Sequence, residues 1–168
     1  MKKDAKEILS YNIVPNIGLG EIHFGMTKDT ILQKYNFEVY LETNECTISG
    51  NRMEFYSLFN ESVILGFDKE ENFSLTSILL ENEFKGKYLN AISIGTPFIE
   101  LYKATKNKMT YDDDLFFPEG NYDFYVNLDY DECKEKLGYP YLSDYMVYNK
   151  DKEMRTCKIE SFFFRKDI

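Results

Sequence analysis

Few side chains in this chain could do acid–base or nucleophilic chemistry: one histidine, His23, and three cysteines, Cys46, Cys133 and Cys157. His23 alternates with two apolar neighbours, so a strand would turn it away from the face that they bury. We therefore expect a surface histidine rather than a general base, and one imidazole cannot supply a paired histidine metal site. The cysteines form no C-x-x-C pair and nothing marks an activated thiol, so we expect free thiols in a reducing compartment.

Three consecutive acids, Asp112, Asp113 and Asp114, could offer hard oxygen ligands to Ca²⁺ or Mg²⁺. Consecutive residues of an extended segment point to alternate sides, however, so they rarely converge on one ion. Among the 29 acids no spacing singles out a carboxylate pair for hydrolysis. The sequence therefore predicts no catalytic residue, no metal and no cofactor, and a metal-dependent hydrolase is the weaker alternative.

The stretch from Met109 to Cys133 holds most of the surplus negative charge, because it contains eight acids and no Lys or Arg. The whole chain has 29 acids against 20 bases and a net charge of −9. The stretch also holds seven aromatic residues, whereas disordered acidic tails have few. We therefore expect an ordered acidic surface that suits a basic protein partner and repels nucleic acid. The acids are Asp112, Asp113, Asp114, Glu119, Asp123, Asp129, Asp131 and Glu132.

Part of this aromatic content has a structural explanation. From Tyr122 to Leu128, apolar residues alternate with Asp123, Tyr125 and Asn127, as in a strand with one face in the core. We expect Tyr125, on the polar face, to be exposed, and tyrosine is favoured at interface centres. The predicted partner-binding residues are Tyr111, Asp112, Asp113, Asp114, Glu119, Asp123 and Tyr125.

The elements that must position these residues are predicted twice along the chain. Residues Ile22–Leu32 align without gaps with Ile92–Tyr102, 70 positions on, and each block predicts a strand, a glycine turn and a helix. Thr27 is expected to cap the first helix. In the second, Thr96 is expected to cap and Pro97 to take the first helical position.

A hairpin with a charged turn is then expected in each half, at 62–80 and at 145–164. Matching them at an offset of 81 implies an insertion of eleven residues in the second copy, within the interval that contains the acidic stretch. The alternative is chance, since both patterns are common. The matched pairs are Phe67 with Tyr148, Phe73 with Met154 and Ile78 with Ile159.

These patterns predict an α+β fold: two tandem helix-plus-antiparallel-sheet repeats, at about 12–88 and about 89–168, packed as the single domain 1–168. Halves of this size bury only modest cores alone, so they should pack together. Further short strands are expected at 37–41, 46–48, 52–58, 115–117 and 122–128, and helices at 1–10 and 131–137. The charged N-terminus, and the absence of any apolar run of about 20 residues, favour a cytoplasmic protein without a membrane partner.

The segment Ile17–Lys28, with Gly25-Met26-Thr27 at its turn, resembles the opening segment of small bacterial proteins built from tandem helix-plus-sheet repeats. These include outer-membrane assembly lipoproteins, β-lactamase inhibitor proteins and immunity proteins. The chain lacks a lipobox cysteine and a signal sequence, so it is most similar to immunity proteins of bacterial contact-dependent growth inhibition systems. The resemblance covers under half of the chain.

That resemblance implies a Whirly-like or β-lactamase-inhibitor-like fold in an acidic cytoplasmic protein that is not an enzyme. It further implies a cognate toxin as partner, here a basic nuclease domain, with strand addition as one mode of binding. The Whirly shape also suggests single-stranded DNA binding, but the net charge of −9 opposes it. An adaptor or structural module of the same repeat fold is the alternative function.

Overall fold

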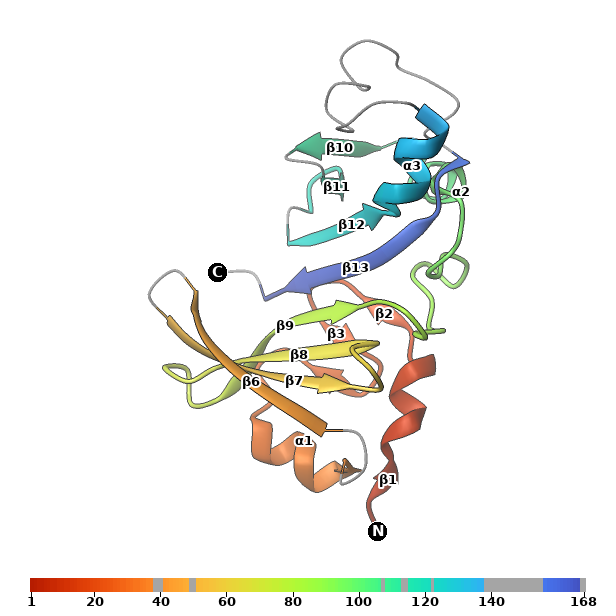
Figure 1. Ribbon diagram of the computed structural model, residues 1–168. Coiled ribbons are helices and arrows are strands. Elements are labelled where there is room, and N and C mark those ends of the chain that lie inside the picture. Colours follow the sequence, from red (N-terminus) through yellow and green to blue (C-terminus); the bar gives the residue numbers. More distant parts are fainter. Residues whose placement is uncertain are drawn as a thin grey trace.

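The computed structural model describes residues 1–37, 41–48, 51–106, 108–112, 115–121, 123–137 and 156–166. This part of the chain forms a mixed α+β fold around one eight-stranded antiparallel sheet, as the predicted class requires. The strand order is β10-β11-β12-β13-β9-β8-β7-β6 (Figure 1). A three-stranded sheet, β2-β3-β4, and a parallel pair, β1-β5, complete the strands that the structure describes. Within these residues no helix is long and apolar enough to cross a membrane.

The large sheet is built from one four-stranded group in each half of the chain. The first group is β6 (Leu41–Ile48), β7 (Asn51–Leu58), β8 (Val63–Asp68) and β9 (Ser74–Leu80). The second is β10 (Met109–Asp112), β11 (Leu115–Pro118), β12 (Phe124–Leu128) and β13 (Ile159–Arg165). The smaller strands are β1 (Lys3–Asp4), β2 (Ile13–Val14), β3 (Gly18–Leu19), β4 (Ile22–His23) and β5 (Tyr35–Asn36). The helices are the 3-10 helix η1 (Ala5–Ser10), α1 (Lys28–Lys34), α2 (Phe98–Ala104) and α3 (Tyr130–Leu137).

The core lies on one face of the large sheet. Side chains alternate along β13, where Phe162 and Phe164 are fully buried and Phe163 is only partly buried. The ring of Phe24, which follows β4, packs edge-on against Phe164 with 5.7 Å between centroids. On α2, Phe98 packs against Phe116 of β11 at 4.5 Å. The β4 end and α2 therefore cover the same face, and burial of these apolar side chains holds the layers together.

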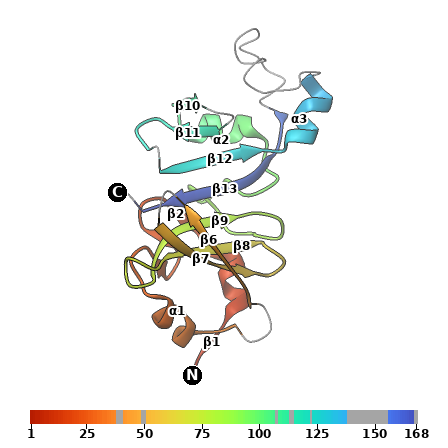
Figure 2. The ribbon, with the colours of Figure 1, turned by 60° about the vertical axis from the view of Figure 1, so that its left-hand side comes forward.

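The two four-stranded groups meet at β9 and β13, which lie side by side at the middle of the sheet (Figures 1 and 2). In this antiparallel pair Leu79 lies opposite Phe163, with Phe162 opposite Leu80 on one side and Phe164 opposite Ile78 on the other. The buried residues of both strands contribute to one core cluster. The halves therefore share a continuous sheet and a core.

The turns before α1 and α2 have the same backbone geometry, and both helices have seven residues. Gly25 and Gly95 adopt φ values of 82° and 79°, a region that glycine enters without steric cost. The Gly25 N–H donates to the Leu75 carbonyl at 2.9 Å, and the Gly95 N–H donates to the Ile159 carbonyl at 2.8 Å. Each turn therefore fixes a helix against the start of β9 or β13.

The helix caps agree with the sequence prediction at α1 but differ at α2. Thr27 is the N-cap of α1, and its hydroxyl accepts from the Thr30 N–H at 3.3 Å. At α2 the prediction was wrong, because Pro97 itself is the N-cap and makes no side-chain capping bond. The Thr96 hydroxyl instead accepts from the Ser93 N–H at 3.1 Å. It closes the turn before the helix, since it lies one position too early to reach the helix donors.

Each four-stranded group has a bulge between its last two strands. The β8–β9 register shifts after Gly66, and the β12–β13 register shifts after Asn127. Beyond these shifts Phe67 pairs with Leu75, and Leu128 pairs with Ile159. Leu75 and Ile159 thus occupy the same position relative to the bulge, whereas the sequence comparison matches Ile159 with Ile78.

The second half has a longer connection before its last strand than the first half has. Strands β10, β11 and β12 follow one another as β6, β7 and β8 do, so the acidic stretch contributes three strands to the sheet. Its last acids, Asp131 and Glu132, lie in α3, within the connection from Leu128 to Ile159. The strand predicted at Tyr145–Tyr148 and the turn after it lie outside the described residues.

Most of the other predicted elements are present. The strands predicted at 52–58, 115–117 and 122–128 correspond to β7, β11 and β12, and the helix predicted at 131–137 corresponds to α3. The strand predicted at 46–48 is the end of the longer strand β6, which begins at Leu41. Residues 38–40 of the strand predicted at 37–41 lie outside the described residues. The predicted N-terminal helix is the short 3-10 helix η1, which buries Ala5 and Ile8.

Candidate functional site on the outer face of the sheet

A line of apolar side chains crosses the face of the large sheet opposite the core. Cross-strand pairing places Tyr125 beside Phe163, Phe163 beside Leu79, and Leu79 beside Ile64. Phe117 of β11 extends the line through its ring contact with Tyr125. All five side chains are partly exposed, unlike the fully buried residues that alternate with them. We call these residues the aromatic stripe: Ile64, Leu79, Phe117, Tyr125 and Phe163.

Ring contacts hold the second half of the aromatic stripe in place. Tyr125 stacks on Phe163 with 4.6 Å between centroids and 27° between planes. Phe117 meets Tyr125 edge-on at 5.7 Å and 61°. Burial raises the pKa of the Tyr125 hydroxyl, which the nearby Arg165 offsets only in part. The sequence predicted an exposed Tyr125 on a polar face, but the ring is half-buried because strand pairing sets two other aromatic rings against it.

Carboxylates lie beyond the aromatic stripe, near the ends of the strands. Glu81 lies two residues after Leu79, and its N–H donates to the Ser62 carbonyl at 3.1 Å, next to Glu61. Asp129 and Asp131 follow β12, and Glu160 lies at the bulge of β13. We call the five acids from these segments the carboxylate border: Glu61, Glu81, Asp129, Asp131 and Glu160.

The carboxylates of the border repel one another electrostatically. Partial burial, followed by the charges of Glu61 and Glu160, raises the pKa of the Glu81 carboxyl. Partial burial, followed by the charges of Asp129 and Asp131, raises the pKa of the Glu160 carboxyl. In the described part of the chain no Lys or Arg forms an ion pair with Glu61, Glu81 or Glu160. Among these residues the border therefore keeps its negative charge.

The acidic stretch seen in the sequence, by contrast, is partly neutralised by bases from outside it. Arg165 lies on β13 beside Asp123, with 2.7 Å between Nε and Oδ1. Lys108 Nζ lies 3.8 Å from Glu119, and Lys158 Nζ lies 3.7 Å from Glu132. The acidic stretch contains no Lys or Arg, but in the folded protein these three cations lie next to its acids. Two of them come from the β13 region.

The seven predicted site residues do not all come together. Asp123 and Tyr125 lie at β12, on the outer face, where Tyr125 is between Phe117 and Phe163 in the aromatic stripe. Glu119 is exposed in the turn after β11. The backbones of Tyr111 and Asp112 lie in β10, at the edge of the sheet among the described strands. The predicted residues Asp113 and Asp114 lie outside the described residues.

Sequence reasoning missed the members of the aromatic stripe that lie in the central strands. The sequence predicted Leu79 and Phe163 within hairpins. Alternation along each strand could have shown that they lie on the other face of the sheet from their buried neighbours Leu80 and Phe162. No local signal could have shown that β9 and β13 are neighbours. The stripe therefore depends on a long-range pairing that the sequence does not reveal.

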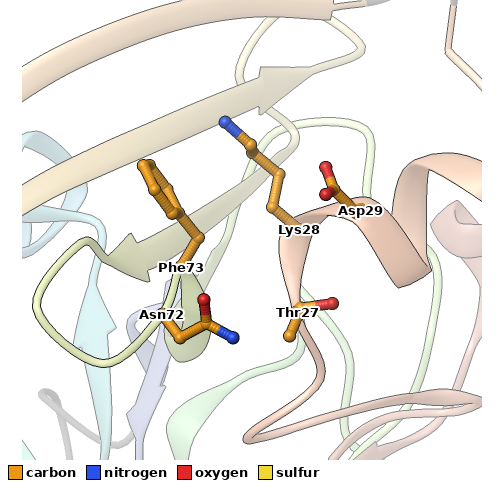
Figure 3. Close-up of a pocket in the computed structure, with 5 residues that line it drawn as sticks. All are labelled: Thr27, Lys28, Asp29, Asn72 and Phe73. Carbon is orange, nitrogen blue, oxygen red and sulfur yellow. The ribbon is translucent and has the colours of Figure 1, made fainter.

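A small polar hollow of about 230 Å³ lies between the start of α1 and the β8–β9 turn (Figure 3). It is lined by Thr27, Lys28, Asp29, Asn72 and Phe73. Lys28 Nζ contacts the Glu54 carboxylate at 3.0 Å and lies 4.4 Å from the centre of the Phe73 ring. Burial lowers the pKa of Lys28, but the Glu54 hydrogen bond and neighbouring charges more than offset this and leave it raised. Lys28 therefore stays protonated, so its ion pair connects α1 to β7 and it cannot act as a general base.

Other reactive groups do not assemble into a site within the described residues. Among these, no three His, Cys, Asp or Glu side chains are grouped so as to hold a metal ion. His23 is exposed, as predicted, with Nε2 3.0 Å from the Gly20 carbonyl oxygen. Cys133 and Cys157 are buried and not joined in a disulfide. Of these features, the outer face with its aromatic stripe and carboxylate border is best suited to bind a partner.

Comparison with known proteins gives one informative likeness. No family model matches the chain, and no curated protein matches it. Among solved structures, the fold is similar to the crystal structure of the uncharacterized protein yfeY from Escherichia coli. The TM-score is 0.61 at 15% sequence identity, over 99% of this chain and 100% of that chain. At this identity the likeness supports the mixed α+β fold and nothing about function.

Proposed function

We propose that this protein is a cytoplasmic immunity protein that binds and neutralises a cationic protein toxin through the outer face of its sheet. The observation that carries the proposal is the self-repelling carboxylate border beside the partly exposed aromatic stripe. Ion pairing with a basic partner would relieve the repulsion that raises the pKa of Glu81 and Glu160. Burial of the stripe by the same partner would remove apolar surface from water.

The arrangement matches the general anatomy of protein interfaces, in which an apolar centre rich in aromatic residues is surrounded by a polar rim. Tyr125 and Phe163 offer large ring surfaces that are already held rigid by stacking, so little side-chain entropy is lost on binding. The carboxylate border would speed encounter with a basic protein, with association rate constants reaching about 10⁸ M⁻¹s⁻¹ at low salt. These acids also repel nucleic acid.

The more specific identity rests on the sequence resemblance to immunity proteins of contact-dependent growth inhibition systems. It supplies the class of partner, a basic nuclease toxin, and a second mode of contact, addition of a toxin strand. Among the described strands, β6 and β10 are the two ends of the large sheet, where such a strand could be added. The predicted residues Tyr111 and Asp112 lie on β10, so strand addition there would bring the partner close to them.

We also infer that the fold consists of two tandem repeats, at about 12–88 and about 89–168. The equal helix lengths, the two glycine turns and the two bulges support this inference. The β9–β13 register supports it as well. When each residue of β9 is matched with one of β13, beginning with Leu75 and Ile159, exchanging the matched residues leaves the pairing of the two strands unchanged. A Whirly-like or β-lactamase-inhibitor-like classification is the narrower form of this proposal.

The test compares two charge reversals of equal size. The variant Glu81→Lys/Glu160→Lys alters the carboxylate border, and the control Glu70→Lys/Glu100→Lys alters two exposed acids in surface ion pairs elsewhere. Each tagged protein is used to capture partners from its own host and is co-expressed with the toxin gene expected beside its own. We expect the border variant alone to lose capture of a basic protein and protection from the toxin. Equal behaviour of the two variants would overturn the proposed surface, and an acidic partner or a non-toxic one would favour an adaptor instead.

A further inference from the structure

Two cysteines from distant parts of the sequence are buried together. Cys133 lies in α3 and Cys157 lies two residues before β13, and their exposed fractions are 1% and 0%. Two hydrogen bonds made by Lys158, the residue after Cys157, tie the two segments together. The Asp129 N–H donates to the Lys158 carbonyl at 2.9 Å, and the Lys158 N–H donates to the Glu132 carboxylate at 2.8 Å.

The two thiols are in direct contact with each other. A hydrogen bond with Cys157, together with burial, raises the pKa of the Cys133 thiol. A thiol that stays protonated is a poor nucleophile, so neither oxidant nor alkylating reagent should modify it readily while α3 is in place. Two sulfur atoms at hydrogen-bonding range can nevertheless be joined with only a small movement of the backbone.

We propose that Cys133 and Cys157 form a specific, reversible disulfide that fastens α3 to the start of β13. A hydroperoxide oxidises one thiol to a sulfenic acid and leaves as water or an alcohol. The second thiol then attacks that sulfur, and the sulfenic hydroxyl leaves with the second proton as water. Two thiols are thus oxidised and one peroxide bond is reduced, so atoms and electrons balance. A dithiol reductant reverses the reaction by thiol–disulfide exchange.

The cross-link would constrain the chain between the two cysteines, which is 23 residues long. Closing a loop of this size restricts the unfolded chain and stabilises the folded state. We expect the melting temperature of the oxidised protein to rise by roughly 10 °C above that of the reduced protein. Because the native thiols are buried, we expect oxidation to be slow and limited by opening of α3.

The test uses folded Cys46→Ser protein, which retains only this cysteine pair, treated with hydrogen peroxide. We expect the intact mass to fall by two hydrogen atoms. Trypsin should then release residues 109–134 cross-linked to residues 156–158 until a reductant is added. Cys46→Ser/Cys133→Ser serves as the matched control and should show neither the cross-link nor the rise in melting temperature.

Three outcomes would overturn the proposal. The first is a gain of two oxygen atoms on one cysteine, which marks sulfinic acid instead of a disulfide. The second is a covalent dimer in place of the internal cross-link. The third is no reaction in the folded protein under conditions that oxidise the same chain in urea. The wild-type protein, treated in parallel, should give the same cross-linked peptide and leave Cys46 in the separate peptide 35–52.

Discussion

Replacing Phe162 by alanine is the sharpest test of the fold, because its ring lies where the two halves of the sheet meet. Phe162 is fully buried on the core face of β13 and lies opposite Leu80 of β9. Its ring stacks on Phe124 of β12 with 6.0 Å between centroids and 9° between planes. The variant therefore removes apolar contacts in both halves at once.

The expected loss follows from the area that the ring removes from water. A buried phenylalanine hides about 150 Å², which at about 25 cal/mol per Å² corresponds to about 4 kcal/mol. This value agrees with the ~3–5 kcal/mol typical of buried Phe→Ala changes, which include the cost of the cavity. It is a large share of the ~5–15 kcal/mol by which domains are usually stable.

The matched control is Phe163→Ala, the same change one residue further along β13 on the opposite face. Phe163 is partly exposed and loses mainly its contact with Tyr125, so we expect a loss of about 1–2 kcal/mol. Urea denaturation followed by circular dichroism measures both losses. Equal losses, or a greater loss for Phe163→Ala, would refute the placement of the core. Two separate transitions in the wild-type protein would refute the single shared core.

Three further predictions concern surface charge and turns. Folding raises the pKa of Glu160 above its ordinary value of 4.5, so its charge costs stability near neutral pH. Glu160→Gln should therefore stabilise the protein at pH 7 by a few tenths of a kcal/mol, roughly, and the gain should vanish below about pH 4 in thermal melts. Hydrogen bonds from Lys3 and then a second lysine lower the pKa of Glu21 to about 2, so Glu21→Gln should melt below the wild type at pH 7. That deficit should shrink as the pH falls from 4.5 towards 2; a deficit independent of pH would contradict the ion-pair explanation. Gly25→Ala and Gly95→Ala should each cost about 1 kcal/mol in denaturant titrations, because both glycines have positive φ and nothing blocks a Cβ. A loss confined to one site would show that the two turns are not equivalent.

Much of the local structure could be predicted because it depends on residues close together in sequence. The glycine turn and the Thr27 cap of α1 were correct, since each bond joins residues within one turn. The helix α3 and the strand β7 were also correct. The predicted N-cap of α2 was wrong by one residue: Pro97 is the cap, and the Thr96 hydroxyl closes the preceding turn.

The candidate site could be predicted only in part. Tyr125 and Asp123 were recognised from the alternation of β12, but their surroundings were not. Arg165 neutralises Asp123, and the Phe163 ring covers Tyr125, because β13 pairs with β12. Glu160 of the carboxylate border had no recognisable signal in the sequence at all. Its importance arises only from the carboxylates that folding brings near it.

The sequence by itself determined the class of fold, the two glycine turns and the surplus of negative charge, because composition and short-range periodicity encode them. Only the tertiary structure decided where that charge is left uncompensated and which rings remain at the surface. Both depend on β9 lying beside β13, a contact between residues more than 80 positions apart. Short-range pattern cannot specify such a contact, since many strand orders bury the same alternating residues equally well.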